Sequence, residues 1–266
     1  MKNLIEQSYY GTIGYISCEQ DINMLKSYIA WNKPILDKFK NIIVATNYIE
    51  SNNKKHFQDL NKELWVENFP NVIILDSNTN RGHSFGTADL DNMLINWCKN
   101  NNIKWLCKAS NDTILHSELL DKKIKDADFH YLNGIGYGGM EKYGFVFDRI
   151  EHEDFYPQTN FYFIRTDKID YLNSREYLDA TYHHIKSLKD YNGKVWEYIV
   201  GWSCEDFLKQ CVERNKLTTN HLIPTKEYKI LLKHIQSNLI HDCSHKNIKI
   251  EGVTHFHNHR LPITII

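Results

Sequence analysis

Three short polar segments, far apart in the chain, carry residue types that can do chemistry on a bound ligand. One is the turn Ser110-Asn111-Asp112, one is the acidic pair Glu205-Asp206, and in the third His255, His257 and His259 alternate with other residues. A carboxylate can bind a divalent cation or accept a proton. Alternating histidines share one face of a strand, where their imidazoles can bind a metal or meet a phosphate.

Each segment also has a structural interpretation. Two acids at the start of a helix can simply be partners of the helix dipole, and histidines near a terminus can be a surface cluster or a cloning remnant. Gly201-Trp202, directly before the acidic pair, favours a ligand site, because a glycine turn beside an aromatic ring suits a saccharide. The varied residues between the histidines argue against a purification tag.

The elements around the first segment predict where it lies. Asn71–Leu75 and Ile103–Cys107 are apolar runs typical of buried strands, and apolar residues between Leu90 and Trp97 recur at helical spacing. We expect Asp89 and Asp91 in the first turn of that helix. Two strands joined by a helix are parallel, and ligands of such sheets gather at the carboxyl ends of the strands, where the polar turn follows.

The rest of the chain predicts an α/β fold with a mostly parallel sheet flanked by helices. Further strands are expected at Thr12–Ser17, Asn41–Ala45, Phe129–Asn133 and Asn160–Arg165. Further helices are expected at Met24–Phe39 (kinked or broken at Pro34), Lys54–Asn68, Leu115–Lys125, Asp167–Asn173, Ser174–Leu188, and from Cys204, with Phe207, Leu208, Cys211 and Val212 as its buried stripe.

Composition narrows the class of protein. The chain has 266 residues, 42% of them hydrophobic, and a formal net charge of −1, which predicts one globular domain over 1–266 and no nucleic-acid partner. We expect no transmembrane segment and no signal peptide, hence a cytoplasmic protein. Six cysteines without a CxxC pair indicate reduced, buried thiols rather than a zinc site.

Glycine placement excludes several nucleotide-binding classes. The loop Ile16–Gln20, after the first expected strand, has no glycine, so the dinucleotide-binding and P-loop signatures are absent. This disfavours NAD oxidoreductases and P-loop kinases, and also the nucleotidyltransferases that make sugar nucleotides. The glycine-rich segment 134–144 is interpreted as a hinge or lid rather than a phosphate cradle, because no helix start clearly follows it.

In the order of these motifs the chain resembles nucleotide-sugar-dependent glycosyltransferases of the GT-A fold, most closely inverting enzymes related to family 2. The resemblance covers roughly Thr12–Arg260. Asn80-Arg81-Gly82 resembles the N-x-G segment before the nucleotide-contacting helix, and Ser110-Asn111-Asp112 stands in the position of the DXD motif. The segment 201–206 (GWSCED) resembles the G-W-G-G-E-D segment of galactosyltransferase-type enzymes, whose second acid is the catalytic base.

The resemblance implies a GT-A-like fold with a nucleotide-sugar-binding half (1–115) and a smaller, mixed or antiparallel acceptor-binding half (116–266). It implies transfer of a hexosyl group from a UDP-, GDP- or dTDP-sugar to a hydroxyl of a glycan, lipid-linked or protein acceptor, assisted by Mn²⁺ or Mg²⁺. With one base and no evident second nucleophile, inversion is expected. The implied site residues are Asp206 and Glu205 for catalysis; Ser17, Asn47, Arg81, Asp89, Ser110, Asn111 and Asp112 for the nucleotide sugar; Trp202 and Tyr137 for the acceptor; and Asp112, His255 and His257 for the metal.

The chain departs from the family at two places, and other classes stay open. Ser110 replaces the first acid of DXD, which favours weaker metal binding or a metal-independent enzyme, and Ser203-Cys204 replace two glycines of the acceptor loop. The alternative function is a non-catalytic nucleotide-sugar- or carbohydrate-binding module on the same fold. A zinc hydrolase built on the terminal histidines is disfavoured, because no H-E-x-x-H motif accompanies them.

Overall fold

The computed structural model describes residues 3–14, 16–47, 54–77, 79, 83–111, 113–115, 126–133, 155, 157–187, 204–222, 248–250 and 253–255. Its helices are α1 (Leu4–Gln7), α2 (Glu19–Leu36), α3 (Lys54–Asn68), α4 (His83–Asn100), α7 (Arg175–Ser187) and α9 (Cys204–Arg214). Its strands are β1 (Tyr9–Gly14), β2 (Ile42–Asn47), β3 (Ile73–Ser77), β4 (Trp105–Ala109), β5 (Thr113–Leu115), β6 (Phe129–Asn133), β7 (Pro157–Arg165), β8 (Thr219–His221), β9 (Ile248–Ile250) and β10 (Val253–His255).

Seven strands form one sheet in the order β3-β2-β1-β4-β7-β6-β8. Strands β3, β2, β1 and β4 are parallel to one another, β7 is antiparallel to both β4 and β6, and β6 is parallel to β8. A second, three-stranded sheet has the order β5-β10-β9 and is antiparallel. The expected α/β fold with a mostly parallel sheet is therefore confirmed.

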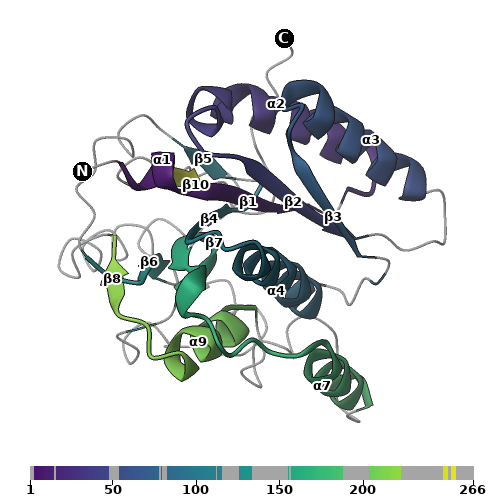
Figure 1. Ribbon diagram of the computed structural model, residues 1–266. Helices are drawn as coiled ribbons and strands as arrows, with labels where there is room; N and C mark the ends of the chain where they lie inside the picture. Colours follow the sequence, from purple (N-terminus) through teal and green to yellow (C-terminus); the bar gives the residue numbers. More distant parts are fainter. Residues whose placement is uncertain are drawn as a thin grey trace.

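Helices cover both faces of the large sheet (Figure 1), and each face has its own apolar core. Helices α2 and α3 pack on one face through residues such as Tyr28 and Trp65. Helices α4 and α9 pack on the other through residues such as Leu94 and Leu208. The expected buried stripe of α9 is confirmed: Phe207, Leu208, Cys211 and Val212 are all buried.

Several expected boundaries were wrong, because hydrogen bonds of the turns, rather than hydropathy, decide where an element ends. The first strand is Tyr9–Gly14 and not Thr12–Ser17, because Ser17 already donates to Asp21 in the first turn of the next helix. Helix α2 continues through Pro34, which lies close to its end at Leu36. Leu115 belongs to strand β5, so the helix expected from that residue does not begin there.

Two predictions about helices also need correction. Helix α4 begins at His83, so Asp89 and Asp91 lie beyond its first turn and not in it. The short helix expected over Asp167–Asn173 is only a 3-10 turn at Thr166–Lys168. The helix dipole therefore does not explain the two acids of α4, and their partners must be sought in tertiary contacts.

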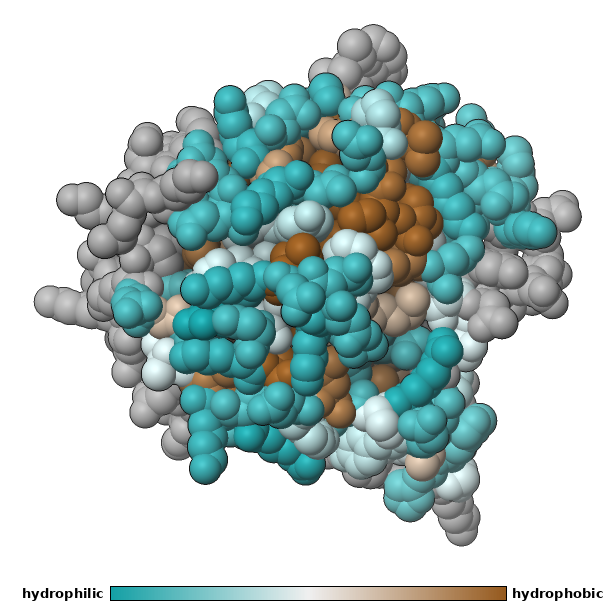
Figure 2. Space-filling view, in the orientation of Figure 1, coloured by the Kyte–Doolittle hydropathy of each residue, from teal (hydrophilic) through white to brown (hydrophobic). Residues whose placement is uncertain are grey.

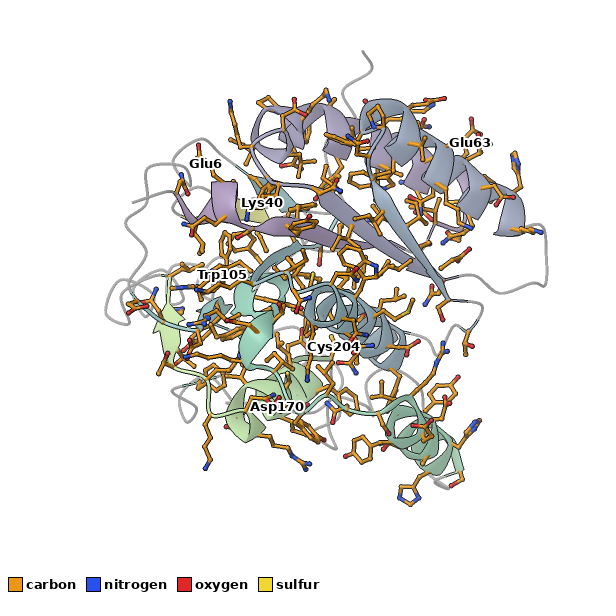
Figure 3. The ribbon with its side chains drawn as sticks, in the orientation of Figure 1. Glu6, Lys40, Glu63, Trp105, Asp170 and Cys204 are labelled. Atoms are coloured by element: carbon orange, nitrogen blue, oxygen red, sulfur yellow. The ribbon has the colours of Figure 1, made fainter. Side chains whose placement is uncertain are left out.

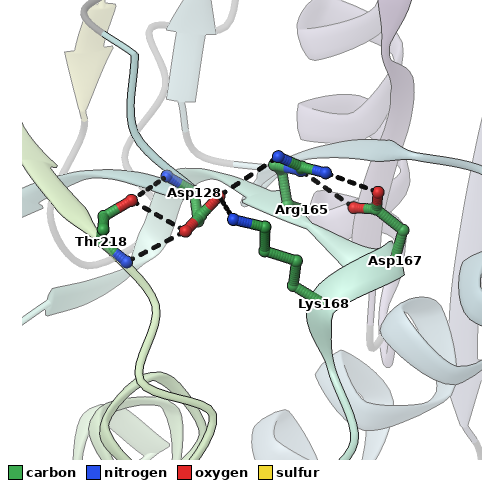
Figure 4. A network of polar contacts seen from close by, with 5 residues as sticks. All are labelled: Asp128, Arg165, Asp167, Lys168 and Thr218. Atoms are coloured by element: carbon green, nitrogen blue, oxygen red, sulfur yellow. Dashed lines mark hydrogen bonds and ion pairs between the residues drawn. The ribbon is translucent and has the colours of Figure 1, made fainter.

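At the amino edge of the sheet, a polar network joins β6, β7 and the segment before β8 (Figure 4). Asp128 accepts hydrogen bonds from the backbone and hydroxyl of Thr218 and pairs with Lys168 at 2.7 Å and Arg165 at 3.4 Å. Arg165 also pairs with Asp167 at 2.7 Å. This network ties the end of β7 to the start of β6, away from the edge that carries the candidate site.

On the face drawn in Figure 2, apolar surface gathers over the β3 side of the sheet and is bordered by hydrophilic side chains. Strand β3 lies at one edge of the large sheet, and its residues Ile73, Ile74 and Leu75 are only partly buried. Among the described residues, no helix is both long enough and apolar enough to cross a membrane.

Candidate site at the carboxyl edge of the sheet

Strands β1 to β4 are parallel, so they all end at one edge of the sheet. Asn47 is the last residue of β2, Ser77 the last of β3, and Ser110 follows β4 directly. Strand β7 runs the other way, so its first residues, including Thr159, lie at this same edge. Ligands of open α/β sheets bind at such an edge.

The β1 and β2 ends place two of the expected nucleotide contacts. Ser17 donates from its backbone N–H (2.8 Å) and its hydroxyl (2.9 Å) to the Oδ2 of Asp21, so both groups are already bonded to the first turn of helix α2. Asn47 is 3% exposed at the end of β2.

A cleft of about 640 Å³ opens beside the end of β3, between α4 and the start of α7. Asp89, another expected nucleotide contact, lines it and is itself buried. Arg175 crosses this cleft: its Nη2 donates to the Oγ of Ser77 at 2.7 Å and to the Oδ2 of Asp89 at 3.4 Å. The polar lining suits a polar ligand, but the Asp89 carboxylate already faces a cation of the same chain.

The most deeply buried polar cluster lies at the end of β4. Lys108 is 0% exposed. Its Nζ donates to the carbonyl oxygen of Thr159 and, at 3.3 Å, to the Oγ of Ser110. It also pairs with the Oδ1 of Asp91 on α4 at 3.5 Å. Ser110, an expected nucleotide contact, is therefore fixed by a buried ammonium rather than by a carboxylate.

Glu205 belongs to the same cluster from the side of α9. It is 6% exposed and accepts hydrogen bonds from the Oγ1 of Thr159 at 3.1 Å and from the Sγ of Cys204 at 3.2 Å. Figure 3 labels Cys204 at the start of α9, between that helix and α4. Asp206, the next residue, is only partly buried. The first acid thus points into the protein, and the second is the more accessible of the pair.

Burial and like charge shift the acid–base behaviour of this cluster. Burial, followed by the nearby charge of Glu205, raises the pKa of Asp91 to about 6, although Lys108 opposes the shift. At 3.5 Å the ion pair with Lys108 is too long for a strong hydrogen bond, and the Oδ1 of Asp91 has no hydrogen-bond donor among the described residues. Two carboxylates and one ammonium therefore share a water-poor space, where one added proton relieves the excess negative charge.

The second sheet brings the histidine segment to the end of β4. Strand β10 pairs with β5, and in that register His255 lies opposite Thr113, the residue after Asp112. Asn32 of α2 holds β5 in place: it accepts from the N–H of Leu115 at 2.6 Å and donates to the carbonyl of Thr113 at 3.1 Å. The polar turn and the histidine strand are thus adjacent, although more than a hundred residues separate them.

The structure brings together some of the expected site residues but not all. Ser110, Glu205 and the backbone of His255 lie around the end of β4 or its continuation, and Asn111 lies in the turn between them. The expected site residues Arg81, Asp112, Tyr137, Trp202 and His257 lie outside the described residues. Within the described part of the chain, no three His, Cys, Asp or Glu side chains form a group able to hold a metal.

Sequence reasoning missed four residues that build this region: Lys108, Asp91 as its partner, Thr159 and Arg175. The sequence does carry a signal for Lys108, because a lysine inside the apolar run Trp105–Ala109 indicates a charged side chain in a buried central strand. Thr159 left none, because it acts through its position in the fold. Neither a scan of protein-family models nor a search of curated proteins finds a match to this chain.

Proposed function

We propose that the protein is a glycosyltransferase of GT-A-like fold, which moves a sugar from a nucleotide diphosphate sugar to an acceptor hydroxyl with inversion. One observation carries the proposal: at the carboxyl edge of the parallel strands, the end of β4 is linked through Lys108 and Thr159 to the start of α9, and strand β10 pairs with β5, which follows β4 in the chain. These are the segments in which the family resemblance locates its metal-binding, base and histidine motifs. The strand ends also offer polar side chains to a donor along the same edge.

Asp206 is the proposed general base, and its exposure relative to Glu205 supports this assignment. A base must reach the acceptor hydroxyl, and Asp206 is the more accessible of the two acids. Glu205 is enclosed by Thr159 and Cys204, so we assign it to orienting the first turn of α9 rather than to binding the acceptor. Inversion needs one base and no protein nucleophile.

The donor diphosphate gains negative charge as its bond to the sugar breaks. Asp112, with His255 or His257, would hold a Mn²⁺ or Mg²⁺ ion that neutralises this charge. The fit rests on the pairing of Thr113 with His255, which makes the residue after Asp112 a neighbour of the histidine strand. One carboxylate with imidazoles is a donor set that suits Mn²⁺ better than Mg²⁺.

The test is a transfer and donor-hydrolysis assay with a panel of UDP-, GDP- and dTDP-sugars. With the nucleotide sugar that the wild type turns over, Asp206→Asn is expected to lower kcat by a factor of roughly 10² to 10⁴, the usual contribution of a general base. Glu213→Gln is the matched control, because it removes an exposed acid from the same helix. Chelator is expected to abolish activity, and Asp112→Ala to copy that loss.

The outcomes separate the proposal from its alternative. Wild-type rates in Asp206→Asn would refute the base assignment, and activity indifferent to both chelator and Asp112→Ala would refute the metal. Calorimetric binding of a nucleotide sugar without turnover, for every acceptor tried, would instead identify a non-catalytic binding module.

A further inference from the structure

The buried cluster at the end of β4 contains a charged residue, Lys108, whose burial is unfavourable for folding and needs an explanation. Lys108 is fully buried on the sheet face that carries α4 and α9, and its cross-strand neighbour is the buried Tyr162. Its ammonium lies 6.0 Å from that ring. Removing a charge from water is unfavourable even when it is paired, and apolar residues of similar size commonly give a more stable core. Folding alone therefore does not account for a lysine at this position.

The ammonium donates two hydrogen bonds and makes one ion pair, and these three contacts reach three different parts of the fold. Thr159 belongs to β7, Asp91 to α4, and Ser110 follows β4. Thr159 passes the connection on, because its carbonyl oxygen accepts from Lys108 while its hydroxyl donates to Glu205. An unbroken chain of contacts thus links the turn after β4 to the first turn of α9.

The two ends of this series of contacts, Ser110 and Glu205, lie on the two sides of the proposed reaction centre. Ser110 begins the turn that contains Asp112, and Glu205 immediately precedes Asp206. The distance between the bound sugar donor and the proposed base Asp206 would therefore depend on contacts made by Lys108, which touches neither substrate. A misplacement of reacting groups by about 1 Å can cost on the order of 10²-fold in rate.

We propose that Lys108 is a positioning residue, which holds the turn after β4 and the first turn of α9 at the separation that transfer requires. This inference rests on the proposed function for its kinetic consequence. Its structural consequence, the coupling of two segments through one ammonium, does not depend on that function.

The test uses a double variant, because Lys108→Met alone leaves two buried carboxylates without a cation and is at risk of not folding. Lys108→Met/Asp91→Asn removes one positive and one negative charge and nearly conserves volume. The matched control is Leu106→Met, an apolar substitution two residues earlier on the same face of β4.

Three measurements are made on the full chain. In urea unfolding, the double variant is expected to be at least as stable as the wild type. In hydrogen–deuterium exchange, segments 109–115 and 204–210 are both expected to exchange faster, while α3 is unchanged. In kinetics, kcat is expected to fall at least tenfold with the KM for the donor within threefold, and Leu106→Met should change neither.

The results distinguish failure of this inference from failure of the proposed function. Unchanged exchange in both segments would overturn the coupling whether or not the protein is an enzyme. A stable double variant with wild-type kcat would overturn the positioning role in transfer. If no nucleotide sugar is turned over by the wild type, the proposed function fails, and faster exchange in both segments still supports the coupling.

Discussion

Asn32 offers a sharp test of how the second sheet is held against the large one. It is buried in α2 with 0% exposure, and its side-chain amide bonds both ends of the three-residue strand β5. Asn32→Leu keeps the size of the side chain but removes these bonds. The N–H of Leu115 and the carbonyl of Thr113 are then left without that partner, and both residues are at most 2% exposed.

The magnitude follows from the number of groups that lose a partner. Taking a hydrogen-bond partner from a buried polar group costs about 1–3 kcal/mol, so the loss of both bonds to β5 predicts a decrease of at most about 2–6 kcal/mol in the free energy of unfolding. Such a loss is a large share of the ~5–15 kcal/mol that stabilises a typical domain. The third bond, from Asn32 to the carbonyl of Tyr28, lies within α2 and adds little, because that carbonyl remains inside the helix.

The assay is urea denaturation followed by tryptophan fluorescence, with Ser27→Ala as the control. Ser27 lies in the same helix and is also buried, but its hydroxyl bonds the carbonyl of Asn23 one turn earlier and thus stays within the helix. Its removal should cost about 1 kcal/mol or less. If Asn32→Leu costs no more than Ser27→Ala, the bonds from α2 do not hold β5, and the reasoning that links α2 to the site is wrong.

Two further predictions concern the sheet itself. Gly11→Ala would place a Cβ 2.7 Å from the Cδ1 of Leu106 in the core and should lower the free energy of unfolding by about 1–3 kcal/mol, measured by heat or urea. At Gly14 the nearest atom is 3.8 Å away, so alanine should be tolerated there. Equal effects at the two positions would refute the close-packing argument. Burial alone would raise the pKa of Asp128, but hydrogen bonds from Lys168 and Thr218 outweigh burial and hold this pKa below its ordinary value. The stability that the Asp128 carboxylate contributes is therefore present above about pH 4 and is lost as the pH falls further. Asp128→Asn should approach the stability of the wild type at acid pH, and a stability difference that does not depend on pH would contradict this.

The fold class could be predicted because it depends on local patterns. Strands β2, β4 and β6 can be predicted because each is a short run rich in apolar residues. Helix α3 has the predicted bounds, Lys54–Asn68. Register and neighbour order could not be predicted in this way. That β1 lies between β2 and β4, and that β10 pairs with β5, follows from contacts between residues far apart in the chain.

The buried cluster shows the same limit within the site. Lys108 and Thr159 are 51 residues apart, and Thr159 and Glu205 are 46 apart. No local pattern couples positions at such separations, because the coupling exists only once β7 lies beside β4 and α9 packs on their face. Residue type identified the acids of α9 as candidates, but only the packed structure shows that Thr159 connects Lys108 to Glu205.

Helical geometry separates the two acids of α9, and this separation bears on which of them the proposed function would use as a base. Residues three, four and seven positions apart lie on one face of a helix. Glu205 shares a face with Leu208 and Val212, which are buried against the sheet, whereas Asp206 shares one with Lys209 and the exposed Glu213. A carboxylate on the buried face is constrained by its protein partners, whereas Asp206, one position later, is only partly buried. If the proposed function is correct, the order of the pair, glutamate first and aspartate second, favours the second acid as the base, because the contacts of Glu205 with Thr159 and Cys204 enclose the first.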